Sequence, residues 1–411
     1  MSKRSISEDW AAVFCAALLI ILALAGIKPT LPSFSWKDFS DLTLIFNADA
    51  ISKLSFLFII MAGIVVVGLI LRGESFRFSN LLGYLAIFLI TVFANIVTGN
   101  SGVKNLGLEI VLFSLLLGLF ISNVLRVPEW ITPVIQTEFY IKIGLVLLGC
   151  GIIFGDILQA GALGLIQSIA VVVVVWQFSF WLCKKFGIDD ELRTMLSSAV
   201  AICGVSAAIA TAGAIKGDSK KLSYVISLVL ITAIPMMLIM PYVAKALGLS
   251  DAVAGAWLGG TIDTTGAVVA AGTVLGEEAL KYATVVKFSQ NVLLGLAAFV
   301  ISVYWTYSKN TQQEKPTVRV LWDRFPKFVL GFILASLLFS FVLSPETLNE
   351  VKGTLKGQQT FWFAMAFTCI GLETKFVDIF KLDNGKPAYA FLIAQFFNIV
   401  FTLAIAWLVF N

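Results

Sequence analysis

Two stretches of the chain combine small residues with hydroxyl, thiol and carboxyl groups, a composition that could bind a small ion or solute. The first reads AICGVSAA over residues 201–208 and contains Cys203, Gly204 and Ser206. The second reads GGTIDTTG over residues 259–266 and contains Thr261, Asp263, Thr264 and Thr265. Hydroxyls and free backbone N–H groups bind anions, whereas a carboxylate binds a proton or a cation. These residue types predict a site for a small charged solute.

A third polar stretch, residues 283–291, carries a lysine followed by two amides: Lys287, Gln290 and Asn291. Lys287 lies about four residues inside the apolar run of residues 283–307. A lysine so close to the end of a run can extend its ammonium to the membrane surface. A surface position and a position in the site therefore both stay open for Lys287. Gln290 and Asn291 lie deeper and could line a pathway or bond neighbouring helices.

The elements that must position these residues are long apolar runs. Of the 411 residues, 59% are hydrophobic and only 13% are charged, and the mean hydropathy is +0.95. Soluble domains carry about 25% charged residues, so the composition excludes a soluble enzyme and a nucleic-acid-binding chain. A helix needs about 20 apolar residues to cross a bilayer. The sequence therefore predicts an all-α polytopic membrane protein with roughly 11–13 transmembrane helices in the lipid bilayer.

The apolar runs that predict these crossings are residues 10–27, 54–71, 81–97, 106–125, 139–157, 160–182, 195–215, 222–247, 253–275, 283–307, 325–343, 361–373 and 388–410. Ser206 and Asp263 each lie about 15 Å along their runs, near the middle of a ~30 Å hydrocarbon core. Residues 204–206 and 263–265 are also suitable N-cap sequences. Each of these two runs is therefore predicted to be a discontinuous helix whose second half begins at the midplane.

The carboxyl group of Asp263 is the strongest single indication of function. A charged side chain at this depth costs at least ~2.5 kcal/mol on insertion scales, and such residues mark ion or substrate pathways. Small residues also let helices pack closely, and serine or threonine can bond to its own backbone. For residues 201–208 alone, this packing explanation stays open.

The distribution of lysine and arginine predicts the orientation of the chain. More of these residues fall in the connections on the side of the N-terminus, which places it in the cytoplasm and the C-terminus in the periplasm of a bacterial inner membrane. We expect one transporter domain over residues 1–411. Within it we expect scaffold or oligomerisation helices over 1–105, a core over 106–307, a cytoplasmic loop over 308–327 and completing helices over 328–411.

Several motifs together resemble the YeiH family of bacterial membrane proteins, a family of sulfate exporters. The matching stretches are residues 144–149 with 156–157, 201–208, 260–272, 283–287, 325–332 and 371–372. The resemblance covers residues 106–411 and extends distantly to cation:proton antiporters and bile-acid symporters. It implies inverted repeats, discontinuous helices and an elevator-type transport motion.

This chain departs from the family pattern at several positions. Asp263 and Thr264 stand where the family usually has histidine followed by an acid, Ala267 stands for glutamine, and Gln290 stands for arginine. The resulting site is less cationic, which indicates an anion other than sulfate or coupling to Na⁺. Residues 144–157 and 364–379 also share a small-residue core followed by an Asp-Ile pair, as inverted repeats would.

These observations predict a secondary transporter of a small anionic solute, inorganic or organic. Ser206, Thr261, Thr264 and Thr265 are expected to hold the substrate together with backbone N–H groups. Asp263 is expected to bind Na⁺ or a proton, because an ionised carboxylate would otherwise repel an anion. A passive anion channel or pore is the alternative.

An enzyme is not expected, although Ser206 or Cys203 could serve as a nucleophile. The chain has no histidine to act as the base that such a nucleophile needs. We expect no cofactor beyond Na⁺ or H⁺ and no nucleic-acid partner, and a homodimer stays open as the assembly.

Overall fold

The computed structural model describes residues 6–38, 40–41, 45–75, 78–105, 110–308, 319–375 and 385–411. These ranges form helices joined by turns and irregular segments, with one isolated bridge between Trp36 and Asn100. The predicted all-α polytopic character is confirmed. Part of the predicted 308–327 loop, residues 309–318, lies outside the described residues, as do residues 376–379 of the predicted internal repeat.

Six of the described helices are long and apolar enough to cross a membrane. They are Ala48–Arg72, Asn80–Thr98, Phe154–Lys185, Ser219–Ala246, Glu277–Trp305 and Lys386–Phe410. Other predicted runs fall on shorter apolar helices, namely Ile110–Leu125, Val205–Ile215, Thr265–Leu275 and Lys327–Val342. Two of these short helices begin within the polar stretches of the sequence. Val205–Ile215 begins within residues 201–208, and Thr265–Leu275 begins within residues 259–266.

The chain divides into two compact units. Unit 1 comprises Met1–Phe154 and Lys327–Phe376, and unit 2 comprises Gly155–Pro326 and Val377–Asn411. Each unit is thus built from two separate parts of the chain. All three polar stretches identified in the sequence belong to unit 2.

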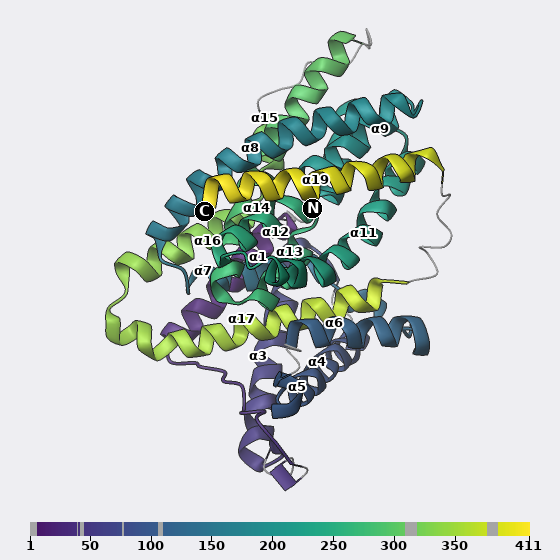
Figure 1. Ribbon diagram of the computed structural model, residues 1–411. Coiled ribbons are helices and arrows are strands. Elements are labelled where there is room, and N and C mark those ends of the chain that lie inside the picture. The colour runs from purple at the N-terminus through teal and green to yellow at the C-terminus, as the bar shows by residue number, and fades with distance from the viewer. Residues whose placement is uncertain are drawn as a thin grey trace. The chain divides into compact units, whose positions relative to one another are not determined.

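Unit 1 is a helical bundle in which the long helix α17 packs against α6 and α7 (Figure 1). Its elements are α1 (Glu8–Leu24), α3 (Ala48–Arg72), α4 (Phe78–Thr98), α5 (Ser101–Asn105), α6 (Ile110–Phe120), η1 (Ile121–Leu125), η2 (Thr132–Val134), α7 (Thr137–Gly149), α16 (Lys327–Leu337), η4 (Leu338–Val342) and α17 (Pro345–Glu373). Glycines allow the closest approach, because a Cβ on Gly371 would lie 2.5 Å from the carbonyl oxygen of Leu115.

A cluster of charged side chains ties three helices of unit 1 together. Lys142 of α7 pairs with Glu8 and Asp9 of α1 at 2.6 and 2.9 Å. Arg72 of α3 lies 3.6 Å from Glu8, and its guanidinium stacks 4.7 Å from the ring centroid of Phe139. Each cation thus has a partner on a neighbouring helix.

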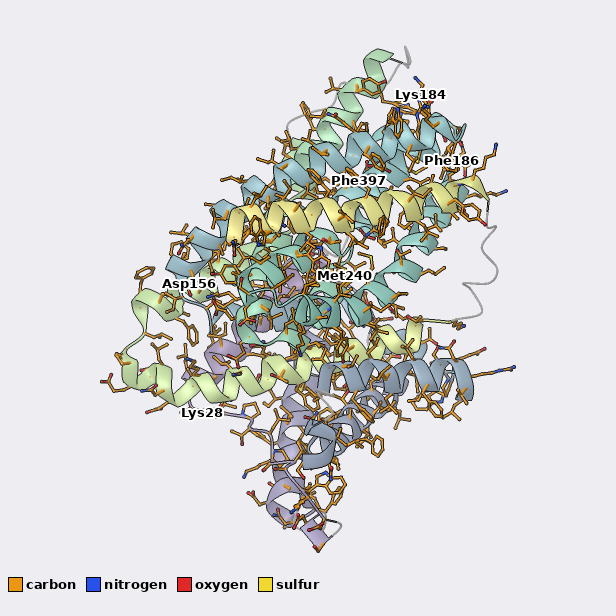
Figure 2. The ribbon with its side chains drawn as sticks, viewed as in Figure 1. Lys28, Asp156, Lys184, Phe186, Met240 and Phe397 are labelled. Carbon is orange, nitrogen blue, oxygen red and sulfur yellow. The ribbon has the colours of Figure 1, made fainter. Side chains whose placement is uncertain are left out.

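Unit 2 contains the helices α8 (Phe154–Lys185), α9 (Asp190–Ser198), η3 (Ala199–Cys203), α10 (Val205–Ile215), α11 (Ser219–Ala246), α12 (Asp251–Thr261), α13 (Thr265–Leu275), α14 (Glu277–Ser308), α15 (Arg319–Arg324) and α19 (Lys386–Phe410). Phe397 of α19, labelled in Figure 2, stacks on Phe178 of α8 with 3.9 Å between ring centroids. Gly255 and Gly259 place α12 against the backbone of α14 at Ala279 and Ala283. Small residues therefore bring α14 close to the helices that carry the polar stretches.

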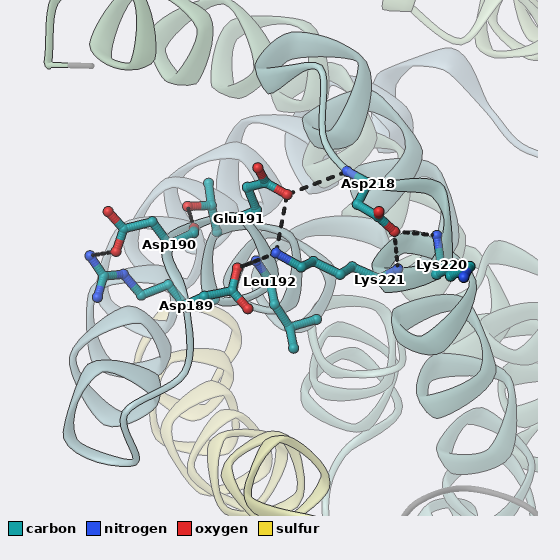
Figure 3. A network of polar contacts seen from close by, with 9 residues as sticks. Asp189, Asp190, Glu191, Leu192, Asp218, Lys220 and Lys221 are labelled. Atoms are coloured by element: carbon teal, nitrogen blue, oxygen red, sulfur yellow. Dashed lines mark hydrogen bonds and ion pairs between the residues drawn. The ribbon is translucent and has the colours of Figure 1, made fainter.

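A polar network joins the starts of α9 and α11 in unit 2 (Figure 3). Lys221 Nζ lies 2.7 Å from Asp189 Oδ1 and 3.2 Å from Glu191 Oε2. Asp218 is the N-cap of α11, and its Oδ1 accepts the backbone N–H groups of Lys221 and Lys220 at 3.1 and 2.6 Å. These N–H groups stabilise the carboxylate and hold the pKa of Asp218 below its ordinary value.

Replacing Asp218 by alanine should lower the thermal midpoint at neutral pH, because α11 loses its cap. Since the folded pKa is depressed, the contribution of the carboxylate is complete above pH ~4 and disappears as the pH falls through the folded pKa. The difference between wild type and variant should therefore close in acid, as measured by thermal unfolding in detergent from pH 7 to pH 3. Asp218→Asn is the control, because asparagine caps a helix without titrating. A difference that is constant over this range would contradict the prediction.

Candidate functional site

The first polar stretch contains the boundary between η3 and α10. Gly204 separates them with φ +58° and ψ −113°, a backbone conformation that residues with a Cβ rarely adopt. Gly204 has no side chain to cap α10, and the first N–H groups of a helix have no intrahelical partner. The start of α10 can therefore donate backbone N–H groups to a ligand.

The second polar stretch contains the boundary between α12 and α13. The last residue of α12 is Thr261, Ile262 is extended with ψ 130°, and α13 begins at Thr265. Thr264 caps α13, because its side chain accepts the backbone N–H of Ala267 at 3.3 Å. Asp263 lies between the two helices. The cap falls within residues 263–265, as predicted.

The two helix boundaries lie against each other. A Cβ on Gly204 would be 2.9 Å from the Cβ of Asp263 and 2.6 Å from Val229 of α11. The starts of α10 and α13 are therefore neighbours, although about 60 residues separate them in the sequence.

Three side chains connect residues 200–202, which precede Gly204, to residues 260–262 at the end of α12. Each side chain donates to one backbone carbonyl of the first segment and one of the second. Lys287 Nζ donates to the carbonyls of Ile202 and Ile262 at 3.1 and 2.8 Å. Gln290 Nε2 donates to those of Ala201 and Gly260 at 3.0 and 3.2 Å. Asn398 Nδ2 donates to those of Val200 and Thr261 at 3.1 and 3.3 Å. We call this set, residues 200–202 and 260–262 with their three donors, the carbonyl junction.

The carbonyl junction satisfies groups that helix ends leave without a partner. The last carbonyls of a helix have no intrahelical donor, and a buried carbonyl without one costs about 1–3 kcal/mol. Two donors come from α14 and one comes from α19, and Thr402 donates to Asn398 Oδ1 at 2.8 Å. The junction thus allows both segments to end inside the protein.

Lys287 lies inside unit 2, with no exposed side-chain surface. A third acceptor, Gln290 Oε1, lies 2.8 Å from Nζ, so three oxygen atoms surround the ammonium. The surface position that the sequence left open is wrong. Helix α14 begins at Glu277, so Lys287 lies 10 residues inside the helix rather than about four.

Asp263 is buried, with 1% of its surface exposed. Its Oδ1 is 3.5 Å from Gln395 Nε2, which is long for a hydrogen bond. Its Oδ2 has no hydrogen-bond partner among the described residues. A buried carboxylate with an unpaired oxygen is costly unless it takes up a proton or a cation.

The other predicted site residues lie around the same two boundaries. Ser206 is exposed in the first turn of α10, whereas Cys203 is buried at the end of η3. Thr264 and Thr265 are half-buried, and Asn291 Nδ2 donates to Thr265 Oγ1 at 3.2 Å. Thr261 Oγ1 and Asn291 Oδ1 are buried and have no partner among the described residues.

Sequence reasoning missed the contributions of α19, which are Gln395, Asn398 and Thr402. All three are buried polar residues in an otherwise apolar helix. Their spacing of three and four residues places them on one helix face. That spacing is the signal that could have identified them.

The described residues contain no group of three or more histidine, cysteine, aspartate or glutamate side chains that could hold a metal ion. Any cation at this site would therefore depend on Asp263 together with hydroxyl, amide and backbone oxygens.

Comparison with known proteins matches residues 82–390 to the family described as conserved hypothetical protein 698. UPF0324 membrane protein RB9488 of Rhodopirellula baltica is 41% identical over 365 residues, which cover 86% of this chain and 67% of the relative. A UPF0324 membrane protein of Nitratidesulfovibrio vulgaris is 36% identical over 374 residues, covering 87% of this chain and 64% of the relative. The chain spans about two thirds of the length of these curated relatives. No solved structure matches.

Proposed function

This chain belongs to the UPF0324 membrane protein family, and we propose from that premise that it is a secondary transporter of a small anionic solute. The observation that carries the proposal is the meeting of two helix starts at Gly204 and Asp263, beside a buried carboxylate oxygen without a hydrogen-bond partner among the described residues. Such an arrangement provides groups of both signs at one place inside the protein.

The proposed anion site is formed by the starts of α10 and α13. Helix N-termini carry a partial positive charge and free N–H groups, which favour an anion. The hydroxyls of Ser206, Thr264 and Thr265 lie in these first turns or at the cap and are not fully buried. The substrate class is an inorganic oxyanion such as sulfate, or a small organic anion.

The proposed coupling group is Asp263. An ionised Asp263 would repel a nearby anion. The anion therefore binds best when Asp263 has taken up a proton or Na⁺. The unpaired Oδ2 is the atom that would take up this cation. A gradient of H⁺ or Na⁺ could then drive transport.

The proposed transport motion is of the elevator type, with the site carried by unit 2. In this proposal η3–α10 and α12–α13 each form one discontinuous membrane crossing, and residues 144–157 and 364–379 belong to two inverted repeats. The proposed orientation, from the distribution of basic residues, has the N-terminus in the cytoplasm and the C-terminus in the periplasm of a bacterial inner membrane.

The substrate can be sought by thermal unfolding in detergent. A ligand that binds only the folded protein raises the thermal midpoint, by about 2.7 kcal/mol of added stability at a concentration of 100 Kd. A screen of oxyanions, sulfonates and carboxylates, with Na⁺ and with choline in its place, should identify both the anion class and any dependence on Na⁺.

Asp263→Asn tests the proposed coupling in proteoliposomes. The variant should lose at least about tenfold of gradient-dependent uptake, because asparagine can neither take up the proton nor pair with Na⁺. Asp156→Asn is the matched control, because Asp156 pairs with Lys281 at 3.1 Å with 45% of its side chain exposed. Uptake by Asp263→Asn that depends on both gradients as in the wild type would remove Asp263 as the coupling group. Electrical currents far above carrier turnover would instead favour a passive anion pore.

A further inference from the structure

The donors of the carbonyl junction differ in charge. Gln290 and Asn398 are neutral amides, whereas Lys287 is an ammonium with no exposed surface. An amide would suffice to connect two carbonyls, as Gln290 and Asn398 show. The third position thus holds a buried cation, which also interacts electrostatically with the carboxylate of Asp263.

The three hydrogen-bond acceptors of the ammonium are all oxygens. Nζ lies 3.1 Å from the carbonyl of Ile202, 2.8 Å from that of Ile262 and 2.8 Å from Gln290 Oε1. The two carbonyls lie at the C-terminal ends of η3 and α12, and the C-terminal end of a helix carries a partial negative charge. Carbonyls at interrupted helices, with side-chain oxygens, are the ligands that hold Na⁺ in discontinuous-helix transporters.

We propose that Lys287 is a tethered cation that fills a monovalent-cation site formed by Ile202, Ile262 and Gln290. The ammonium is supplied permanently by α14, so a free cation has no place among these oxygens. The consequence for transport rests on the proposed function: a coupling ion would act at Asp263, because the junction oxygens are already occupied.

Lys287→Ala tests this assignment, because the truncation removes a group equivalent to n-propylammonium and leaves the three oxygens in place. In choline chloride the variant should unfold at a lower temperature than the wild type. Added n-propylammonium or Na⁺ should raise its midpoint by about 5 °C at a concentration of about 100 Kd. The wild type should gain no such shift from n-propylammonium.

Two further variants test whether the response to n-propylammonium depends on the vacated volume and on the position of the lysine. Lys287→Met fills the volume of the side chain without a charge, so n-propylammonium should not raise its midpoint. Lys281→Ala is the matched substitution on the same helix, where Lys281 pairs with Asp156 and Glu278 outside the junction. Its midpoint should not respond to n-propylammonium either.

The readout is the thermal midpoint or, for a variant that aggregates, its recovery as a monodisperse peak on size exclusion. A Lys287→Ala variant that no cation stabilises or recovers would overturn the proposal, as would a wild type that gains as much from n-propylammonium. The measurement requires no transport. A wild type that moves no solute in liposomes would therefore refute the proposed function and leave this result intact.

Discussion

Replacing Gln290 by leucine should lower the free energy of unfolding by roughly 2–6 kcal/mol. The substitution leaves the carbonyls of Ala201 and Gly260 without this donor, and each unpaired buried carbonyl costs about 1–3 kcal/mol. It also removes one of the three oxygens around Lys287. Thermal unfolding of the purified protein in detergent should show the loss.

Gln358→Leu is the matched control for this prediction. Gln358 of α17 is as buried as Gln290, with 1% exposed surface for each. Both polar atoms of its amide lack a hydrogen-bond partner among the described residues. Leucine should therefore be neutral or stabilising at position 358. Equal losses in the two variants would indicate that burial alone, rather than the carbonyl junction, determines the effect.

Replacing Gly204 by alanine should destabilise unit 2 strongly and abolish the proposed anion binding at the adjacent helix starts. The φ of +58° is unfavourable for a residue with a Cβ, at a cost of about 1–3 kcal/mol. The added Cβ would also lie 2.6 Å from Val229 and 2.9 Å from Asp263. Forcing extra volume into a packed interior costs about 1–3 kcal/mol more. Thermal unfolding and ligand-induced stabilisation should both report the loss.

Gly248→Ala separates the cost of the backbone strain from the cost of the steric clash. Gly248 has a similar φ of +64°, but a Cβ there would meet nothing within 4 Å. Its replacement should therefore cost only the backbone strain, about 1–3 kcal/mol, without the additional cost of a steric clash. A Gly204→Ala variant no less stable than Gly248→Ala would contradict the close approach of Gly204 to Asp263.

The location of the candidate site follows from the sequence because its residues differ from the surrounding apolar pattern. Gly204 and Asp263 stand out in runs where lipid-facing helices would carry leucine and valine. The same patterning predicted the all-α polytopic fold. Helix starts next to both residues follow from local chemistry: glycine permits a positive φ at 204, and threonine caps a helix at 264.

Other features could not be predicted because they depend on contacts between distant segments. Hydropathy placed the start of the run that contains Lys287 at residue 283, but charged Glu277 and Glu278 begin the same helix, since acidic residues are favourable in a first turn. Lys287 therefore appeared closer to a surface than it is. Likewise, Asn398 shows its role only once α19 lies beside both carbonyl segments.

The carbonyl junction has a consequence for how the sequence can change over evolution. Its acceptors are backbone atoms, so the bonds do not depend on the chemical identity of the side chains at Val200, Ala201 and Ile202, which are constrained only by packing in the core. The number of residues cannot vary as freely. One residue inserted between 200 and 202, or between 260 and 262, would shift carbonyls past their donors. Insertions should therefore be restricted to turns outside these two segments, where no donor depends on the register of the backbone.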